Sequence, residues 1–506
     1  METHMPILTL GQLLGPIAII VASGYCISIF VAWYRLRHLP GPFLASLSSI
    51  WYALLASSGG QYEGFNALFE KHGGLVRIGP NLLVTNDPEV ISGMTGHKST
   101  WVRDDWYKGG RIDPYHTTMF SMVEPKSHDR VKARLARAYS GRETESLEPG
   151  VDSQIVAMIA LLRRKYLNGT TSQQGRFVDM AQLSNFFTLD VITRAAYGEA
   201  IGFLTRDADM YEFCAEVRKS WVTMTLMMSV PFLRRIVFSS PVLKLLGPKH
   251  TDSKGVGRMM RVAKEATERR FAGDLRKEKN MIASFARSGL DQRACEGEAL
   301  FVLLAGSETT AVAMRSTILY IITNPRVHRD FRKMIVGSIR DGTVSSPITV
   351  AEAKRIPYLQ AVILEGLRIR TPSQGLMPKV VPPEGVNVHG KYVPGGTAIG
   401  LGLGSALRTK SVFGDDAELF RPERFLEADE ATRAKMESTV MLQFGAGRWA
   451  CAGQPLAFME LNKVFFELLR HFDFEVVNPV KPFESINFNV LVDQFMWMRV
   501  TEANLD

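Results

Sequence analysis

Cys451 lies in the stretch "QFGAGRWACAGQPLAFMELNKVFFELL", which sets one cysteine between glycines and a long apolar run. Three glycines let the backbone turn tightly and come close to a flat or bulky group, namely Gly445, Gly447 and Gly453. Pro455 is typical of a first helical turn, where free N–H groups and the helix dipole favour a thiolate. This cysteine is therefore a candidate nucleophile, a candidate haem-iron ligand or a buried structural residue. The sequence nearby supplies no histidine base, which favours the iron ligand.

A second segment, "LLAGSETTA" (303–311), interrupts a helical pattern that runs over 296–324. Gly306 and the threonines weaken a helix, and Glu308 is costly to bury among leucines and alanines. The segment is either a kinked surface stretch or a site that needs an acid and hydroxyl groups.

The loop "FGAGRWACAG" (444–453) resembles the haem-binding loop of the cytochrome P-450 family of haem-thiolate monooxygenases. The resemblance implies that Cys451 ligates the iron of haem b and that Phe444 shields the sulfur. It also implies that two glycines lie against the haem, Gly447 and Gly453. The family usually has a basic residue two positions before the cysteine, where this chain has Trp449. Arg448 is therefore a candidate for the contact with a haem propionate.

Other segments carry the same resemblance. In the family, the pair in "EGLR" (Glu365 and Arg368) closes on an arginine of "PERF", here Arg424, and the triad braces the cysteine loop. The segment 303–311 resembles the oxygen-binding helix, which implies that Ala305 and Gly306 make room over the haem and that Glu308 and Thr309 relay protons. The stretch "SHDRVKARLARAYS" (127–140) is either an ordinary solvated basic helix or the helix that reaches the propionates. The positions that match the family's propionate contacts are His128 and Lys132 on this helix and Lys379 on a nearby strand.

The resemblance spans about residues 37–500 and, in the general pattern of its sequence, is greatest to the fungal pisatin-demethylase-like branch. It implies that O2 and electrons from NADPH, passed through NADPH–cytochrome P-450 reductase, oxidise a small apolar substrate in secondary metabolism. The apolar substrate contacts are expected from 101–125, 205–250, 297–309, 372–378 and 488–495. Three alternatives stay open: oxidative phenol coupling, an isomerase or dehydratase that uses no O2, and a haem protein without enzymatic activity.

Helical periodicity dominates the chain and predicts a mainly α protein with small β-sheets, consistent with the cytochrome P-450 fold. Helices are predicted over 151–165, 208–227, 258–279, 296–324, 357–370 and 455–471. Strands are predicted near 75–85, 386–401 and 488–500. No linker or repeat follows the N-terminal segment, so we expect one catalytic domain over 37–506.

Residues 13–34 are uncharged and long enough as a helix to cross a bilayer. Trp33 and Tyr34 are typical of a membrane interface, and the basic residues Arg35 and Arg37 favour a cytosolic body. We expect residues 1–36 to be a single-pass anchor in the endoplasmic reticulum, with a core helix or a signal peptide as the alternatives. The stiff "LPGP" at 39–42 is suited to separating the anchor from the body.

The four cysteines show no paired spacing, which argues against a disulfide framework or a structural zinc site. The net charge is +9, but no basic block interleaves with aromatic residues, so a nucleic acid partner is not expected. The excess of basic residues is either an ordinary solvated surface or a docking surface for an acidic partner or anionic lipid.

Overall fold

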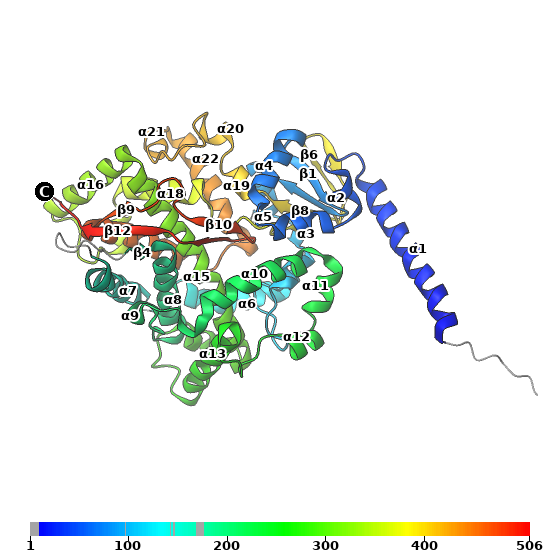
Figure 1. The fold of residues 1–506 in the computed structure, drawn as a ribbon, viewed down its shortest axis with the longest axis horizontal. Coiled ribbons are helices and arrows are strands. Elements are labelled where there is room, and N and C mark those ends of the chain that lie inside the picture. The colour runs from blue at the N-terminus through cyan, green and yellow to red at the C-terminus, as the bar shows by residue number, and fades with distance from the viewer. Residues whose placement is uncertain (1–9, 97, 142, 145–146, 168–176, 506) are drawn as a thin grey trace, which may run out of the picture.

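The computed structural model describes residues 10–96, 98–141, 143–144, 147–167 and 177–505, with side chains from Ser23 onward. The chain is mainly helical with small sheets, as the periodicity predicts (Figure 1).

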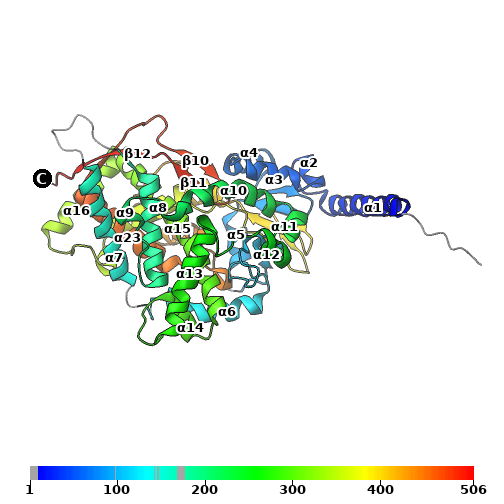
Figure 2. The same ribbon diagram turned by 60° about the horizontal axis from the view of Figure 1, so that its bottom comes forward.

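A long helix, α15 (Gln292–Thr323), runs through the middle of the molecule (Figures 1 and 2). It begins where the Asp291 carboxylate accepts from the Ala294 N–H, and it ends before Asn324, which caps α16 (Pro325–Arg340). Helix α15 packs against α8 (Met180–Tyr197), α18 (Pro357–Ile369) and α23 (Gln454–His471). Among the residues whose side chains the structure describes, from Ser23 onward, it is the one helix long and apolar enough to span a bilayer, and most of it is buried in the body.

The remaining helices of the body surround this centre. They are α2 (Phe43–Leu47), α3 (Ile50–Ser57), α4 (Gln61–His72), α5 (Pro88–Thr95), α6 (Pro125–Tyr139), α7 (Leu147–Leu161), α9 (Phe203–Arg206), α10 (Phe213–Ser229), α11 (Pro231–Val237), α12 (Ser240–Leu246), α13 (Gly255–Ala272), α14 (Met281–Arg287), α17 (Val350–Ala353), α19 (Leu403–Ala406), α20 (Lys410–Phe413), α21 (Arg424–Glu427) and α22 (Glu430–Met441). Short 3-10 turns are η1 (Asp105–Gly110), η3 (Met210–Glu212), η4 (Leu442–Phe444) and η5 (Gly447–Trp449), and η2 (Leu162–Tyr166) is a π-helical turn.

The largest sheet has the strand order β1-β2-β8-β5-β3. Its strands are β1 (Leu75–Gly79), β2 (Leu82–Thr85), β8 (Ala398–Leu401), β5 (Lys379–Val380) and β3 (Val102–Arg103). The antiparallel register of β3 on β5 sets Arg103 directly opposite Lys379. Smaller sheets join β4 (Val178–Asp179), β12 (Trp497–Glu502) and β9 (Phe472–Val476), then β10 (Glu484–Asn487) and β11 (Leu491–Gln494), and finally β6 (Val386–Val388) and β7 (Lys391–Val393).

The predicted helices are confirmed with shifted ends. The pattern over 258–279 is too long, because α13 ends at Ala272 before Gly273. The predicted helix 208–227 divides into η3 and α10, because Tyr211 adopts a φ of +61°. The predicted helix 151–165 starts four residues earlier and passes into the π-helical turn η2.

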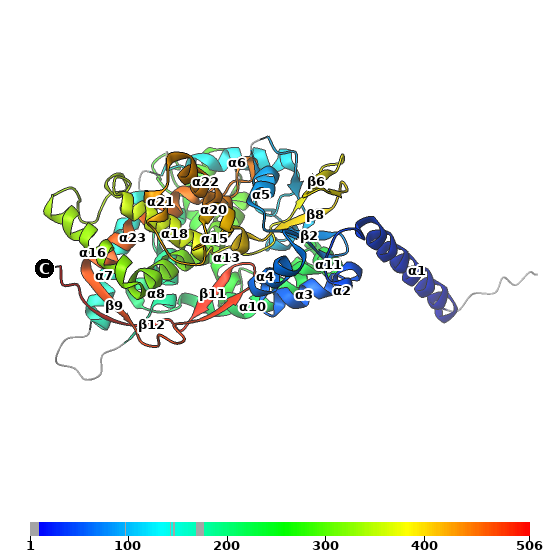
Figure 3. The same cartoon turned by 90° about the horizontal axis from the view of Figure 1, so that it is seen from above.

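Helix α1 (Leu10–Leu36) projects from the body in every view (Figures 1 and 3). The predicted anchor, residues 1–36, lies partly outside the described residues, because the structure describes side chains only from Ser23. From there on, large apolar side chains are exposed: Tyr25, Ile27, Phe30, Val31 and Tyr34.

The last turn of α1 belongs to the body. Leu36 is fully buried in an apolar cluster that includes Leu83 and Ile399. Arg77, which is also buried, donates from Nη2 to the carbonyls of Ala32 at 2.9 Å, Pro80 at 2.7 Å and Ser46 at 3.2 Å. The "LPGP" at 39–42 is a non-helical break between α1 and α2, as predicted, and Arg77 of β1 binds backbone carbonyls on both sides of it in a hydrogen-bonded joint.

Candidate active site

The loop that carries Cys451 joins α22 to α23 through η4 and η5. Gly445 and Gly447 have φ of +65° and +57°, a conformation that glycine adopts without strain. The Cys451 N–H donates to the Phe444 carbonyl at 2.7 Å and closes the loop. Gly453 lies in the predicted turn and leads into α23, but its φ of −79° is one that any residue adopts.

The Cys451 side chain lies among protein atoms but the residue keeps solvent-accessible surface. Burial raises the pKa of the Cys451 thiol, while the N–H groups of Gly453 and Gln454 and the charge of Lys132 lower it. The N–H groups at the helix start therefore lower the pKa of the thiol, as predicted, but by less than burial raises it. Because a bound metal ion deprotonates a coordinating thiol outright, the site suits a metal thiolate better than a free nucleophile.

Lys132 of α6 holds the cysteine loop from one side. Its Nζ donates to the carbonyls of Arg448 at 2.9 Å, Ala450 at 2.8 Å and Gly447 at 3.4 Å. These bonds engage all three donors of the ammonium group. The structure thus places Lys132 on the loop itself, and its predicted contact with a propionate stays a prediction.

Trp449 is the centre of a cluster of basic side chains. The Arg103 guanidinium lies 4.5 Å and the Lys379 Nζ 4.6 Å from the centroid of its indole ring. The His128 ring lies 4.5 Å from it, centroid to centroid. We call these four residues the Trp449 cluster.

The Trp449 cluster holds positive charge with little to neutralise it. His128 and Lys379 are almost fully buried, and no carboxylate contacts Arg103 or Lys379 within the part of the chain that the structure describes. Burial and the charge of Arg103 hold the pKa of Lys379 well below its ordinary value and lower that of His128 to about 4. The Arg103 Nε atom is buried without a hydrogen-bond partner. A group with carboxylates, such as haem, fits these donors.

Arg448 lies outside this cluster. Its guanidinium is half-exposed, contacts the Asp129 carboxylate at 3.4 Å and is 6.0 Å from the Trp449 ring centroid. The predicted propionate contact of Arg448 stays a prediction. Phe444, the residue expected to shield the sulfur, packs against Phe458 of α23 with 5.5 Å between ring centroids.

The predicted oxygen-binding segment lies in the middle of α15. Ala305 is exposed although α15 is largely buried around it. Gly306 faces α8, where a Cβ atom would lie 3.3 Å from the Ile192 side chain, so its lack of a side chain serves helix packing. The Thr309 hydroxyl donates to the Ala305 carbonyl at 2.9 Å.

Glu308 lies in a buried ionic network. One carboxylate oxygen pairs with the guanidinium of Arg315, and the other accepts from the Asn185 side-chain amide at 2.9 Å. Arg315 also contacts the Asp493 carboxylate at 2.8 Å. The acid that the sequence predicts as a proton donor is therefore already engaged by a cation of its own helix.

The structure brings Glu365, Arg368 and Arg424 together in the core. Arg368 contacts both carboxylate oxygens of Glu365 at 2.7 and 2.8 Å, and the Arg424 Nε contacts one of them at 3.1 Å. The two guanidinium groups also bind backbone carbonyls around α20 and α21. The segment after α18 meets the cysteine loop where the Thr371 hydroxyl donates to the Gln443 side chain at 3.1 Å.

Sequence analysis missed Arg103 and Arg315. Arg103 has no recognisable spacing to any motif, because its position depends on the pairing of two two-residue strands. Arg315 did carry a signal, because a charge inside the apolar pattern 296–324 needs a buried partner.

Comparisons with known proteins agree with the resemblance. A sequence model of the family described as "Cytochrome P450" matches residues 40–496. The chain is 46% identical to "Cytochrome P450 monooxygenase aba1" of Botryotinia fuckeliana, over 92% of each protein. It is 43% identical to "Cytochrome P450 monooxygenase abl1" of Leptosphaeria maculans, over 94% of this chain and 86% of that protein.

The likeness to the pisatin-demethylase-like branch is also confirmed, at lower identity. "Pisatin demethylase" of Fusarium vanettenii is 28% identical over 90% of this chain and 87% of its own length. Membership of this family implies a haem with a thiolate ligand, a small-molecule substrate and O2. The chain therefore belongs to the cytochrome P450 family and is a monooxygenase of the oxidoreductase class.

Proposed function

We propose that this monooxygenase is anchored in the endoplasmic reticulum membrane and oxidises a mainly apolar small molecule in fungal secondary metabolism. Its electrons come from NADPH through NADPH–cytochrome P-450 reductase. The observation that carries the proposal is the accessible Cys451 in a glycine-turned loop, near the buried Lys379 and the partly buried Arg103, neither of which contacts a carboxylate of the described chain. A haem held there by the Cys451 thiolate supplies the reductive activation of O2 and the oxidation of a C–H bond.

Thr309 and Glu308 are the residues we assign to proton delivery. The Thr309 hydroxyl donates to the Ala305 carbonyl, and its two lone pairs remain able to accept from a water molecule. Glu308 reaches such a water only by turning away from Arg315 and Asn185. Thr309 therefore positions the water, and Glu308, once its ionic contact opens, takes up a proton from solvent and passes it to that water.

The apolar substrate is supported by a separate cluster of aromatic and methionine side chains. Trp106, Tyr107 and Met228 form this cluster, and Phe120, Val123, Met224, Phe238 and Met377 pack against it. Phe120 also stacks on Phe301 of α15 with ring centroids 5.1 Å apart. These residues come from four of the five segments in which the sequence predicts substrate contacts.

A basic face beside the cysteine loop supports an acidic redox partner. Lys126, Arg130, Arg134 and Arg137 are all exposed on α6, the helix whose Lys132 holds the loop. Two of these side chains, Lys126 and Arg130, form no ion pair with any described residue. Electrostatic steering by such a face speeds association with an acidic partner.

Two features support a membrane-bound enzyme. The described side chains of α1 expose apolar surface, and so do α2, α3, α11 and α12 through Phe43, Leu44, Leu54, Phe232, Leu245 and Leu246. Helices α2, α3 and α11 lie at the end of the body from which α1 projects (Figures 1 and 3). A lipid surface around α1 would cover this apolar surface.

Replacing the cysteine ligand tests the proposal. We expect Cys451→Ser to abolish the thiolate-type spectrum of the reduced carbon monoxide complex and all turnover with NADPH, reductase and O2. The matched controls Cys214→Ser and Cys295→Ser remove thiols whose pKa is raised by burial, and they should keep the spectrum. A thiolate-type spectrum in Cys451→Ser would refute the ligand, and turnover without NADPH would favour an isomerase or dehydratase.

A further inference from the structure

Arg103 and Lys379 form an unusual pair of like charges. They are direct partners in the antiparallel register of β3 and β5, so their side chains project from the same face of the sheet. Like charges directly opposite each other destabilise a strand pair, and burial strengthens the repulsion because little water remains to screen it. Lys379 is 2% exposed, and Arg103 lowers its pKa further. The repulsion between these two cations costs stability, which a ligand of opposite charge would offset.

Trp449 holds the two cations in place. Its indole contacts both charged groups within the range of cation–π attraction. The indole is itself fixed, because Nε1 donates to the Trp101 carbonyl at 3.2 Å, two residues before Arg103. The same side chain therefore binds the strand that carries Arg103 and attracts the charges of both strands.

The remaining donors of the pair identify the ligand chemistry. Arg103 Nη1 donates to the carbonyls of Met119 and Phe120 at 2.8 Å and of Met122 at 3.1 Å. Its Nε is buried without a partner, and the Lys379 Nζ has only the rings of Trp449 and Tyr107 beside it in the described chain. These free donors match carboxylates, which bind guanidinium and ammonium groups through charge-assisted hydrogen bonds.

The family resemblance already implies a propionate contact for Lys379; we propose that Arg103 shares this contact and that Trp449 is the positioning residue of both cations, in place of a basic residue at position 449. The inference rests on the proposed function, because it requires haem at Cys451. It differs from the prediction that Arg448 makes this contact: Arg448 is half-exposed and contacts Asp129. In this arrangement, the cysteine loop has no cation at position 449, and its Trp449 instead contacts two cations of the neighbouring sheet.

The rate of haem transfer from the purified holoenzyme to an excess of a haem-binding apoprotein tests the assignment. A charge-assisted hydrogen bond contributes about 1.5–3 kcal/mol, so Arg103→Gln and Lys379→Gln should each speed haem release by about 10-fold or more. Trp449→Leu should give a similar increase, and Trp449→Phe a smaller one, because a phenyl ring attracts cations more weakly than indole. The exposed cation Lys108 is a matched control, and Lys108→Gln should leave the rate within about twofold.

Two further readouts separate this role from a structural one. Loss of the Arg103 or Lys379 charge should lower the haem reduction potential, because nearby positive charge favours the reduced state. In a protein with Arg103→Gln and Lys379→Gln, the further change Trp449→Arg should restore slow haem release by returning a cation to the loop. A purely structural Trp449 would give no such rescue.

The outcomes are distinct from those of the cysteine test. The haem that remains in each variant should keep the thiolate-type carbon monoxide spectrum, because Cys451 is intact. Wild-type haem release in Arg103→Gln and Lys379→Gln, or a larger effect of Arg448→Ala than of either, would overturn the inference and leave the monooxygenase proposal standing. Loss of the thiolate-type spectrum in Cys451→Ser bears on the proposed function alone.

Discussion

Thr309 is the residue at which the role of a single hydroxyl group can be tested by substitution without changing the rest of the site. It lies on α15 beside the exposed Ala305, whereas Glu308 lies on the side of the helix that contacts α8 and Arg315. We therefore expect the two neighbours in sequence to contribute differently: Thr309 to hold a water, and Glu308 to relay a proton only after it leaves its ionic contact.

We expect Thr309→Ala to keep haem and substrate binding, because the change removes one small side chain from the surface of a helix that is otherwise intact. NADPH consumption should continue, product formed per NADPH should fall by about 10-fold or more, and hydrogen peroxide should rise. The measurement is the ratio of product and peroxide to NADPH consumed. Thr309→Ser keeps the hydroxyl and should stay coupled, and full coupling in Thr309→Ala would place the proton route elsewhere.

At the scale of elements, Asp493 of β11 joins α15 to the end of α18. Its carboxylate contacts Arg315 at 2.8 Å and Arg370 at 2.7 Å, and it is buried. These two arginines hold the pKa of Asp493 below its ordinary value, against the effect of burial. The β11 strand is thereby fixed against the helix that carries Thr309.

We expect Asp493→Asn to lower the free energy of unfolding by about 3–5 kcal/mol, because Arg370 loses the carboxylate that it contacts and the buried Arg315 keeps only Glu308. Since the folded-state pKa is depressed, this stabilisation is present above pH 3.8 and is lost as the pH falls through the folded-state value. Denaturant unfolding measured at neutral pH checks the change, and Asp341→Asn, at an exposed pair with Arg340, is the control. Equal stability of the two variants would contradict the role of the network.

The N-terminal helix gives a prediction about where the anchor can be cut. Removing residues 1–29 keeps the turn that Arg77 binds and the buried Leu36. Removing residues 1–36 also takes Leu36 out of its cluster, which costs about 1.5–3 kcal/mol. We expect both truncated proteins to bind membranes less, and we expect only the longer deletion to lower the melting temperature of the body. Equal melting temperatures would show that the joint adds no stability.

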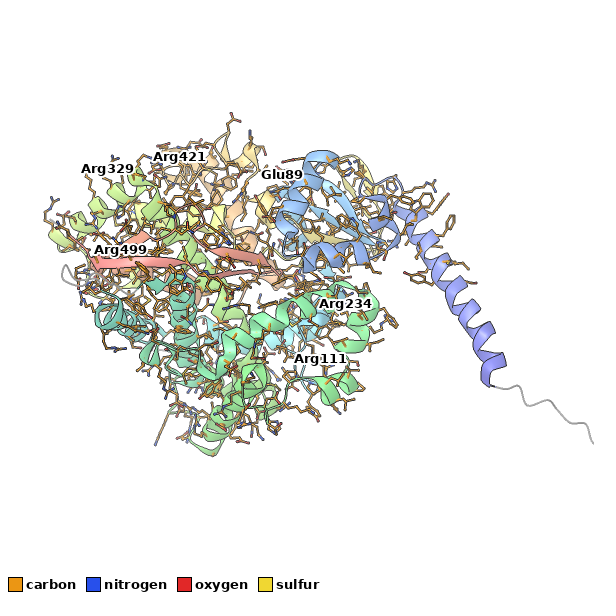
Figure 4. The ribbon with its side chains drawn as sticks, in the orientation of Figure 1. Glu89, Arg111, Arg234, Arg329, Arg421 and Arg499 are labelled. Carbon is orange, nitrogen blue, oxygen red and sulfur yellow. The ribbon has the colours of Figure 1, made fainter. Side chains whose placement is uncertain are left out.

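At the scale of the whole molecule, we assign the basic face of α6 to the reductase and the apolar end near α1 to the membrane. We expect Arg130→Glu to raise the KM for reductase by about 10-fold at low salt and to have less effect at high salt, because surface charges are screened. Arg329→Glu is the control, since Arg329 is an exposed cation on α16, which lies far from α1 in Figure 4. Equal effects of the two reversals would mean that the net charge matters rather than the face.

The sequence predicted the parts of the site that local motifs determine. The motifs that contain Glu365, Arg368 and Arg424 carry the family resemblance, which implies that the three side chains meet, and the structure places them in contact. The Cys451 loop was predictable too, because glycines mark its turns. The donors around Trp449 were not, because Arg103 and Lys379 meet through the register of two very short strands, which no periodicity in the sequence reveals. Likewise, the bonds of Lys132 to the loop depend on how α6 packs, which the sequence does not show.

The joint at Arg77 has a consequence for the rotational diffusion of the enzyme. The guanidinium binds carbonyls of α1, of α2 and of the turn after β1, and a Cβ atom on Gly41 would lie only 2.2 Å from the Arg77 carbonyl, so the chain between helix and body has no room to swivel. With α1 in a bilayer, the body tilts only as far as the helix tilts. A fluorescent label on the body should then show slow, restricted anisotropy decay in membranes, and Arg77→Ala should release a faster component without changing how much protein is bound.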